Sequence, residues 1–185
     1  MMRSTWFRSL ALGALLLGIL TPAARAALPV GAKAPMFTLQ ATKGGKVFPF
    51  SLAAALKKGP VVLYFYPAAF TPGCTIEAHD FAAAIGKYKA LHATVIGVSH
   101  DPLAKLQKFS VSACRSKFAV AADTNQAVMK EYDAILTAAP QYANRTSYVI
   151  SPQGRVIYTY TNLQPDKHVA NTLAALKRWE ATHKI

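Results

Sequence analysis

Strand-like apolar runs alternate with helix-like segments along this chain, and that alternation restricts the possible folds more than any other feature. The run VVLYFY at residues 61–66 is β-branched, aliphatic and aromatic throughout, as expected for a central strand buried on both faces. The run ATVIGVS at 93–99 has the same character, and FAVAAD at 118–123 supplies a third strand and a turn. Because helix-like segments separate these strands, we expect parallel pairing through crossover connections.

Hairpins and helices complete the prediction. Strands at 36–39 and 46–50 flank KGGK, and strands at 146–150 and 155–161 flank the turn SPQG. Short helices are expected at 52–57 and 128–132, and a longer one at 167–182. Another helix should run from Thr75 onward, with one face formed by Ile76, Phe81, Ile85, Tyr88 and Leu91. A further helix should begin at Pro102, with Asp101 as its N-cap. The order predicts an α/β chain with a thioredoxin-like fold, in which helices flank a central mixed sheet and an N-terminal β-hairpin forms an extension.

The first 26 residues have the features of a cleaved signal peptide. Arg3 and Arg8 give a positive start, residues 10–20 form an apolar run, and Ala24–Ala26 has the small-x-small form of a cleavage site. The run is shorter than the roughly 20 residues that a membrane span needs, and an uncleaved anchor is the alternative. Cleavage would leave one domain, residues 27–185, exported to a bacterial periplasm.

The chain is strongly basic, with 21 Lys and Arg against 8 Asp and Glu and a formal net charge of +13. Such a balance favours anionic surfaces or acidic partners. The basic residues are scattered, however, and no aromatic stripe is interleaved with them, so we interpret the charge as solvated surface and expect no nucleic-acid binding. The five histidines show no metal-ligand spacing, so we expect no metal site.

The two cysteines, Cys74 and Cys114, carry the strongest chemical signal. In an exported protein a pair of cysteines suggests a disulfide. Cys74 follows the buried strand at 61–66 and opens a helix, at the sheet edge where open α/β folds place their chemistry. The free N–H groups and the positive dipole end of a first helical turn favour the thiolate, which is the nucleophilic form of the sulfur.

Thr71 distinguishes this corner from that of a thioredoxin, where the same position carries Cys-x-x-Cys. The four residues here are Thr71-Pro72-Gly73-Cys74. Without a thiol at the first position, simple dithiol exchange is disfavoured. A hydroxyl three residues before a thiolate is suited instead to hydrogen-bond the sulfur and a bound oxygen, which would serve attack on an O–O bond.

The segment Pro67-x-x-x-Thr71-x-x-Cys74 resembles the active-site motif of peroxiredoxins, and FYPAAFTPGCTIEAHDF resembles their bacterioferritin-comigratory, or Q-type, subfamily. GAKAPMFTL, GVSHD and NRTSYVISPQGRVIY match other parts of that family, so the resemblance covers nearly all of the chain after residue 26. It implies a thiol-dependent peroxidase that reduces hydrogen peroxide and organic hydroperoxides in antioxidant defence. It also implies no cofactor, a thioredoxin-like or other thiol reductant as partner, and a monomer.

The resemblance assigns a role to each matching residue. Cys74 would be the peroxidatic cysteine, which attacks the terminal peroxide oxygen and becomes a sulfenic acid. Thr71 would hold peroxide and sulfur in line, and Pro67 would shield the sulfur. Arg145 would keep the thiolate charged and polarise the peroxide; a surface arginine at a strand start is the alternative.

Cys114 is the candidate for the resolving cysteine. Many Q-type members carry that cysteine five residues after the peroxidatic one, where this chain has His79, which we interpret as partly exposed. Other members carry it in the next helix, and Cys114 lies at the end of that predicted helix, 40 residues beyond Cys74. A permanent structural disulfide and an inert thiol are the alternatives. If Cys114 resolves Cys74, we expect local unwinding at both, because a disulfide needs Cα atoms within about 7 Å.

Two other functions fit the sequence. One is a thiol–disulfide oxidoreductase of the same fold, and the other is a non-enzymatic, disulfide-stapled basic binding domain in which Cys74 is already bridged.

Phe70 is expected to influence the choice of peroxide. Many relatives have a polar residue at this place in the active-site loop, so we expect the aromatic ring to favour bulkier organic hydroperoxides.

Overall fold

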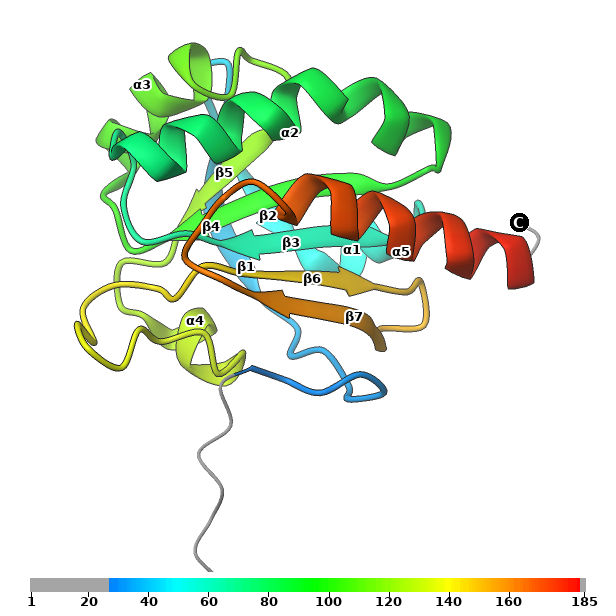
Figure 1. Ribbon diagram of the computed structural model, residues 1–185. Coiled ribbons are helices and arrows are strands. Elements are labelled where there is room, and N and C mark those ends of the chain that lie inside the picture. The colour runs from blue at the N-terminus through cyan, green and yellow to red at the C-terminus, as the bar shows by residue number, and fades with distance from the viewer. Residues whose placement is uncertain (1–26, 184–185) are drawn as a thin grey trace, which may run out of the picture.

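The computed structural model describes residues 27–183, so the predicted signal peptide at 1–26 lies outside the described residues. Within 27–183, seven strands form one mixed sheet and five helices flank it (Figure 1). The strands are β1 (Thr38–Lys43), β2 (Lys46–Ser51), β3 (Val61–Phe65), β4 (Thr94–Ser99), β5 (Ala119–Ala122), β6 (Thr146–Ile150) and β7 (Val156–Thr161). The helices are α1 (Leu52–Leu56), α2 (Pro72–Ala90), α3 (Leu103–Ser112), α4 (Ala127–Glu131) and α5 (His168–Thr182).

The strand order is β2-β1-β5-β4-β3-β6-β7. The three central strands β5, β4 and β3 are parallel, as the crossover argument predicts. β6 pairs antiparallel with β3, and β7 with β6. The N-terminal hairpin β1–β2 joins the other side of the sheet through β1 and β5. The predicted mixed sheet with an N-terminal hairpin is therefore present.

The core is divided by the sheet into two hydrophobic clusters. Alternate residues of β3 point to opposite faces, so that Leu63 and Phe65 enter one cluster while Val62 and Tyr64 enter the other. All five residues of β3 are buried, as expected for a strand covered on both faces. The second cluster contains residues of α2, α3 and α5, and it holds both cysteine side chains.

The first hairpin differs from the prediction in its first strand. β1 runs over 38–43 rather than 36–39, and continues up to a two-residue turn at Gly44 and Gly45. Both glycines have positive φ, +56° and +77°, which a tight hairpin turn requires and which other residues rarely adopt. The turn is therefore shorter than KGGK, and Lys43 pairs directly with Lys46.

The helix that carries Cys74 begins earlier than predicted, at Pro72 rather than Thr75. Proline is favoured at a first helical position because its missing N–H would have no partner there. The predicted buried face is wrong at its start: Ile76 is 50% exposed, whereas Glu77 is fully buried. Phe81 and Tyr88 are buried as expected.

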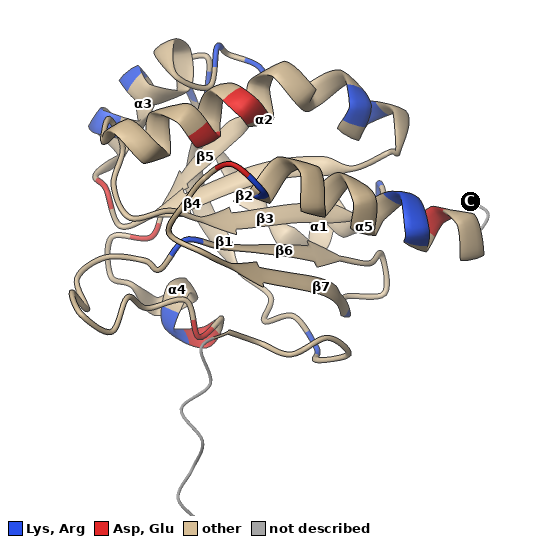
Figure 2. Cartoon of the chain, viewed as in Figure 1, with Lys and Arg blue, Asp and Glu red and all other residues tan. Residues whose placement is uncertain are grey.

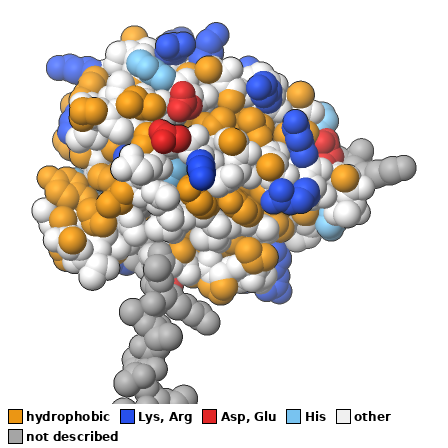
Figure 3. Space-filling view, viewed as in Figure 1, with side chains coloured by type: hydrophobic (Ala, Val, Ile, Leu, Met, Phe, Trp, Pro, Cys, Tyr) orange, Lys and Arg blue, Asp and Glu red, His pale blue; other side chains and the backbone are white. Residues whose placement is uncertain are grey.

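Basic residues are spread over several elements, including α2, α3 and α5 (Figure 2). On the face shown in Figure 3, Lys and Arg side chains are spaced apart rather than gathered in one patch.

Across residues 27–183, we find no helix with the length and apolar content that a membrane crossing requires.

Candidate active site

Cys74 lies in the first turn of α2, just beyond the carboxyl end of β3. Thr71 is the N-cap residue with an extended backbone, and its carbonyl accepts the N–H of Thr75 at 2.9 Å. The amides between these two residues belong to the first turn, where N–H groups have no partner within the helix. The thiol side chain is only 1% exposed. The predicted placement of the cysteine at a helix start is therefore correct.

The loop that leads into this helix is held by Asp101. Its Oδ2 accepts the Ala69 N–H at 2.7 Å and the Ser99 hydroxyl at 2.9 Å. Its Oδ1 lies 2.7 Å from Nζ of Lys105. Asp101 thus connects the loop before Cys74 to the end of β4.

This contact explains why the predicted N-cap of α3 is wrong. Pro102, with an extended backbone, is the N-cap residue, and the helix begins at Leu103. The Asp101 carboxylate accepts hydrogen bonds from the loop, from β4 and from the Lys105 side chain, and no side-chain hydrogen bond caps the start of α3.

Arg145 approaches Cys74 from the start of β6. Its Nη2 lies 3.4 Å from Sγ of Cys74, its Nη1 donates to Oε2 of Glu77, and its Nε donates to the Leu163 carbonyl at 2.8 Å. The residue is 4% exposed, so it is not a surface arginine. Gly73 leaves room for this approach, because a Cβ there would lie 3.1 Å from Nη2.

One guanidinium therefore lies between two acidic groups, Glu77 and Cys74. Burial raises the pKa of Glu77 to about 8, although the charge of Arg145 acts in the opposite direction. Burial alone would lower the pKa of Arg145, but Glu77 and Cys74 produce a net rise. A single cation shared with the cysteine does not offset the burial of the carboxyl, so the pKa of Glu77 lies well above that of an exposed glutamate while Arg145 stays charged.

His168, the first residue of α5, supports the protonated form of Glu77. Burial lowers the pKa of His168 to about 4, so the ring is neutral at neutral pH. Its Nε2 lies 2.9 Å from the Asn162 carbonyl and must donate to it, which leaves Nδ1 to accept from the Ser147 hydroxyl at 2.8 Å. Glu77 Oε1 lies 3.6 Å from Nδ1 and has no hydrogen-bond partner among residues 27–183. A proton on Glu77 avoids placing an anionic oxygen against the Nδ1 lone pair.

Thr71, Pro67 and Phe70 form the more accessible side of the site. The Thr71 hydroxyl donates to the Ala68 carbonyl at 2.9 Å rather than to Cys74. Pro67 is half-buried and follows β3 closely. Phe70 is 48% exposed, has a φ of +69°, and packs edge-on against Phe109 with ring centroids 5.2 Å apart. A positive φ in a bulky residue marks strained backbone.

Cys114 lies in the turn after α3, fully buried in the same hydrophobic cluster as Cys74. Both cysteines are free thiols in this structure. Burial raises the pKa of the Cys114 thiol well above its usual range. Arg115 and Ser116, which follow it, have φ values of +48° and +55°, so the backbone next to this thiol is also strained.

An aromatic row runs through this cluster from α2 to α3; it consists of Phe81, Tyr64, Tyr66 and Phe109. Neighbouring ring centroids in the row are 4.4, 5.5 and 5.7 Å apart. The Tyr64 hydroxyl is buried without a hydrogen-bond partner in the described part of the chain, which is unfavourable.

Glu77 and His168 were not singled out from the sequence. A signal existed for Glu77, because a residue three positions after Cys74 shares its helix face and this face is otherwise apolar. His168 gave no signal, since its contact comes from α5, far along the chain.

His79 is half-exposed, as expected. Within 27–183, no group of three or more His, Cys, Asp or Glu side chains is placed to hold a metal ion.

The mixed sheet defines an α/β fold. Its candidate site is a buried cysteine thiol in a first helical turn, in contact with a buried arginine. The sequence model of the AhpC/TSA family matches residues 30–159, and the chain belongs to this family. It is 38% identical over 148 residues to chloroplastic peroxiredoxin Q of Triticum aestivum, an alignment that covers 80% of this chain. The chain spans only 66% of the length of that plant relative.

Two solved structures show the same fold. Peroxidoxin BcpB from Mycobacterium tuberculosis superimposes with a TM-score of 0.73 and 30% identity, over 80% of this chain and 96% of that one. A bacterioferritin comigratory protein of Xanthomonas campestris, described for its alkyl peroxide reduction activity, superimposes with a TM-score of 0.70 and 26% identity, over 77% and 91%. The thioredoxin-like fold and the resemblance to Q-type, or bacterioferritin-comigratory, peroxiredoxins are thereby confirmed.

Proposed function

We propose that this chain is a thiol-dependent peroxidase that reduces hydrogen peroxide and organic hydroperoxides through Cys74. The observation that carries the proposal is the 3.4 Å contact between Arg145 Nη2 and Cys74 Sγ in the first turn of α2. A cation at this distance would stabilise the negative charge on the reacting sulfur and peroxide oxygens during the attack, and the helix N-terminus acts in the same direction. Membership of the AhpC/TSA family supports the same chemistry.

The first step would transfer one oxygen atom. The Cys74 thiolate attacks the terminal oxygen of ROOH, an S–O bond forms, and the O–O bond breaks. With uptake of one proton the leaving group departs as ROH, which is water for hydrogen peroxide, and the sulfur is left as a sulfenic acid. Arg145 and the first-turn amides would stabilise the negative charge that moves onto the oxygens.

Thr71 and Pro67 would position the peroxide. The Thr71 hydroxyl uses its proton on the Ala68 carbonyl, so its lone pairs are left to accept a hydrogen bond from the peroxide O–H. Pro67 would limit the access of water to the sulfur from the β3 side.

The test is peroxide consumption by the reduced protein in the presence of a dithiol. Cys74→Ser is expected to lose all activity, whereas Cys114→Ser is expected to keep the first oxidation step at the wild-type rate. Equal rates for the wild type and Cys74→Ser would reject the proposal.

We further propose that Cys114 is the resolving cysteine. Its thiol would attack the Cys74 sulfenic acid, form the disulfide and release water, and an external dithiol of the thioredoxin type would then reduce the disulfide by exchange. Two features support opening of this region once Cys74 is oxidised. They are the strained turn at Arg115 and Ser116, and the buried Tyr64 hydroxyl, which has no hydrogen-bond partner among residues 27–183.

Trapping of the sulfenic acid with dimedone tests this role. In the wild type, Cys74 is expected to escape trapping because Cys114 captures it, while in Cys114→Ser the adduct should accumulate on Cys74. Equal trapping in both proteins would show that an external thiol resolves Cys74.

We also propose that organic hydroperoxides are preferred over hydrogen peroxide. Three exposed apolar side chains lie on segments next to the buried sulfur: Phe70 in the loop before α2, Ile76 in its first turns, and Leu163, whose carbonyl holds Arg145. They would offer an apolar rim to an alkyl or aryl group. Equal kcat/KM for hydrogen peroxide and cumene hydroperoxide would count against this preference.

The remaining proposals rest on the sequence and the resemblance. We propose that residues 1–26 are removed on export to a bacterial periplasm and that the mature protein acts as a monomer. N-terminal sequencing of the protein from a periplasmic extract should begin at Ala27, and sedimentation should give the mass of one chain. A start at Met1 in a membrane fraction would identify an uncleaved anchor instead.

A further inference from the structure

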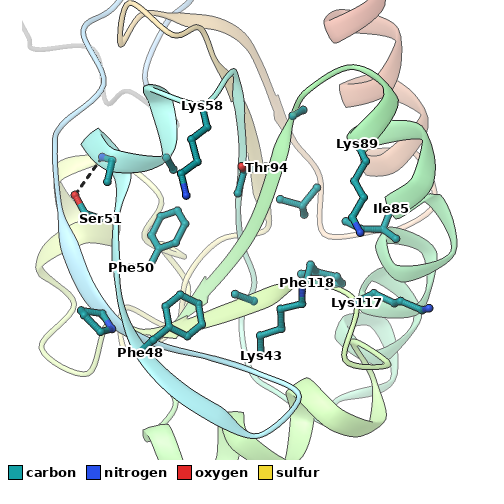
Figure 4. Close-up of a pocket in the computed structure, with 16 residues that line it drawn as sticks. Lys43, Phe48, Phe50, Ser51, Lys58, Ile85, Lys89, Thr94, Lys117 and Phe118 are labelled. Carbon is teal, nitrogen blue, oxygen red and sulfur yellow. Dashed lines mark hydrogen bonds between the residues drawn. The ribbon is translucent and has the colours of Figure 1, made fainter.

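A groove of about 450 Å³ lies away from Cys74 and takes no part in the proposed peroxidase chemistry. It is lined by the hairpin β1–β2 and α1 on one side and by the second half of α2 on the other (Figure 4). Its base includes the starts of β4 and β5, whereas Cys74 follows the end of the parallel strand β3. The volume falls in the range of small-molecule sites, roughly 300–1,000 Å³.

The lining of the groove is largely apolar. Phe48 and Phe50 come from β2, Ile85 from α2, and Phe118 directly precedes β5. Phe48 is 36% exposed, so an aromatic surface is open to a ligand. A small hydrophilic anion would leave these side chains uncovered.

Four lysines from separate segments surround the same groove: Lys43, Lys58, Lys89 and Lys117. All four are exposed, and none takes part in an ion pair within residues 27–183. Among the described residues that line the groove there is no Asp or Glu. In Figure 4, Lys58 extends from the α1 side and Lys89 along the α2 wall, while Lys117 points away. Like charges around one cavity repel each other, and a bound anion would relieve that repulsion.

We propose that this groove binds a single-chain anionic amphiphile, specifically a fatty acid. The alkyl chain lies on the aromatic and aliphatic lining, and the carboxylate is attracted by the ammonium groups that surround the groove, which include Lys58 and Lys89. The charge complementarity selects an anion, and the apolar lining selects one with a hydrocarbon chain. The site is independent of Cys74, so its occupant does not compete with peroxide.

Isothermal titration of the folded protein with dodecanoate, below its micelle concentration, tests this site. We expect one saturable site that weakens with added salt. Lys58→Gln combined with Lys89→Gln should weaken binding about fivefold to tenfold, since two of the surrounding positive charges are lost. Lys130→Gln combined with Lys177→Gln removes the same charge outside the groove and should leave the affinity within about twofold. Ala54→Trp, at an exposed lining position, should fill the groove and abolish binding while peroxide reduction continues.

Three results with soluble ligands would overturn the proposal. They are the absence of saturable binding, an equal loss for the two lysine pairs, and equally tight binding of dodecyltrimethylammonium. Binding to anionic phospholipid vesicles without binding of monomeric dodecanoate would also overturn it and would identify this face as a membrane contact. Peroxidase activity is measured separately in each variant, so failure of this site leaves the proposed function untouched.

Discussion

Glu77→Gln tests the electrostatics of the site through its effect on stability. Glutamine has the shape of the protonated side chain and keeps an oxygen to accept from Arg145 Nη1, but it cannot ionise. The pKa of Glu77 is about 8 in the folded protein because of burial and 4.5 without it. Between these two pH values the folded protein holds a proton that the unfolded chain has released. Rising pH therefore favours unfolding of the wild type in this window, and the variant lacks that dependence.

The size of the effect follows from the shift. Each pH unit between 4.5 and about 8 is worth about 1.4 kcal/mol for one proton, so the free energy of unfolding of Glu77→Gln should rise relative to the wild type by roughly 3–5 kcal/mol across the window. Urea unfolding followed by circular dichroism, at several pH values from 4.5 to 9, measures this difference. Glu131→Gln, at an exposed position, is the matched control and should follow the wild type throughout.

Parallel pH profiles for Glu77→Gln and the wild type would refute this reasoning. They would mean that Glu77 is ionised and that Arg145 is occupied by a conventional ion pair. The activity makes the same distinction: if Glu77 is neutral at pH 7, Glu77→Gln keeps a rate within a few-fold of the wild type, because Arg145 still faces Cys74 with its full charge.

Three further substitutions give separate tests. Arg145→Met should lower the rate of Cys74 oxidation, measured by stopped-flow fluorescence, by about 10²–10³-fold, the usual cost of losing one donor that stabilises the developing charge; a loss below threefold would exclude a catalytic role. Phe70→Asn suits the positive φ and removes the ring, so it should lower kcat/KM for cumene hydroperoxide about tenfold and leave hydrogen peroxide unchanged. Gly97→Ala places a Cβ 2.6 Å from Cζ of Tyr64 and should lower the free energy of unfolding in urea by about 1–3 kcal/mol. An unchanged midpoint of the urea transition would show that the Tyr64 ring moves freely.

The parts of the fold that sequence reasoning predicted are those set by local pattern. The continuous apolar run at 61–66 identifies a strand buried on both faces, and β3 is fully buried. Cys74 was placed correctly at a helix start because Pro72 and the change of periodicity lie within a few residues of it. Gly44 and Gly45 indicate the hairpin turn because glycine, which has no Cβ, adopts a positive φ readily, and both residues have a positive φ in the structure.

The parts that sequence reasoning missed depend on contacts between distant segments. Asp101 is a residue type favoured at N-caps, but its carboxylate accepts a hydrogen bond from the N–H of Ala69, 32 residues earlier in the loop before Cys74. Glu77 shares the buried face of α2 with Cys74, but its partners, Arg145 just before β6 and His168 in α5, come from distant segments. The start of β1 shifted for the same reason, since Ala41 and Thr42 pair with β5. No local pattern encodes such partners.

The role of Cys74 is tested by mixing the reduced protein with one equivalent of hydrogen peroxide, timing the loss of thiols, and mapping the products by peptide mass spectrometry. We expect rapid loss of two thiols and a peptide in which Cys74 is joined to Cys114. Thiol loss no faster than that of free cysteine, with Cys74 unmodified, would contradict this role.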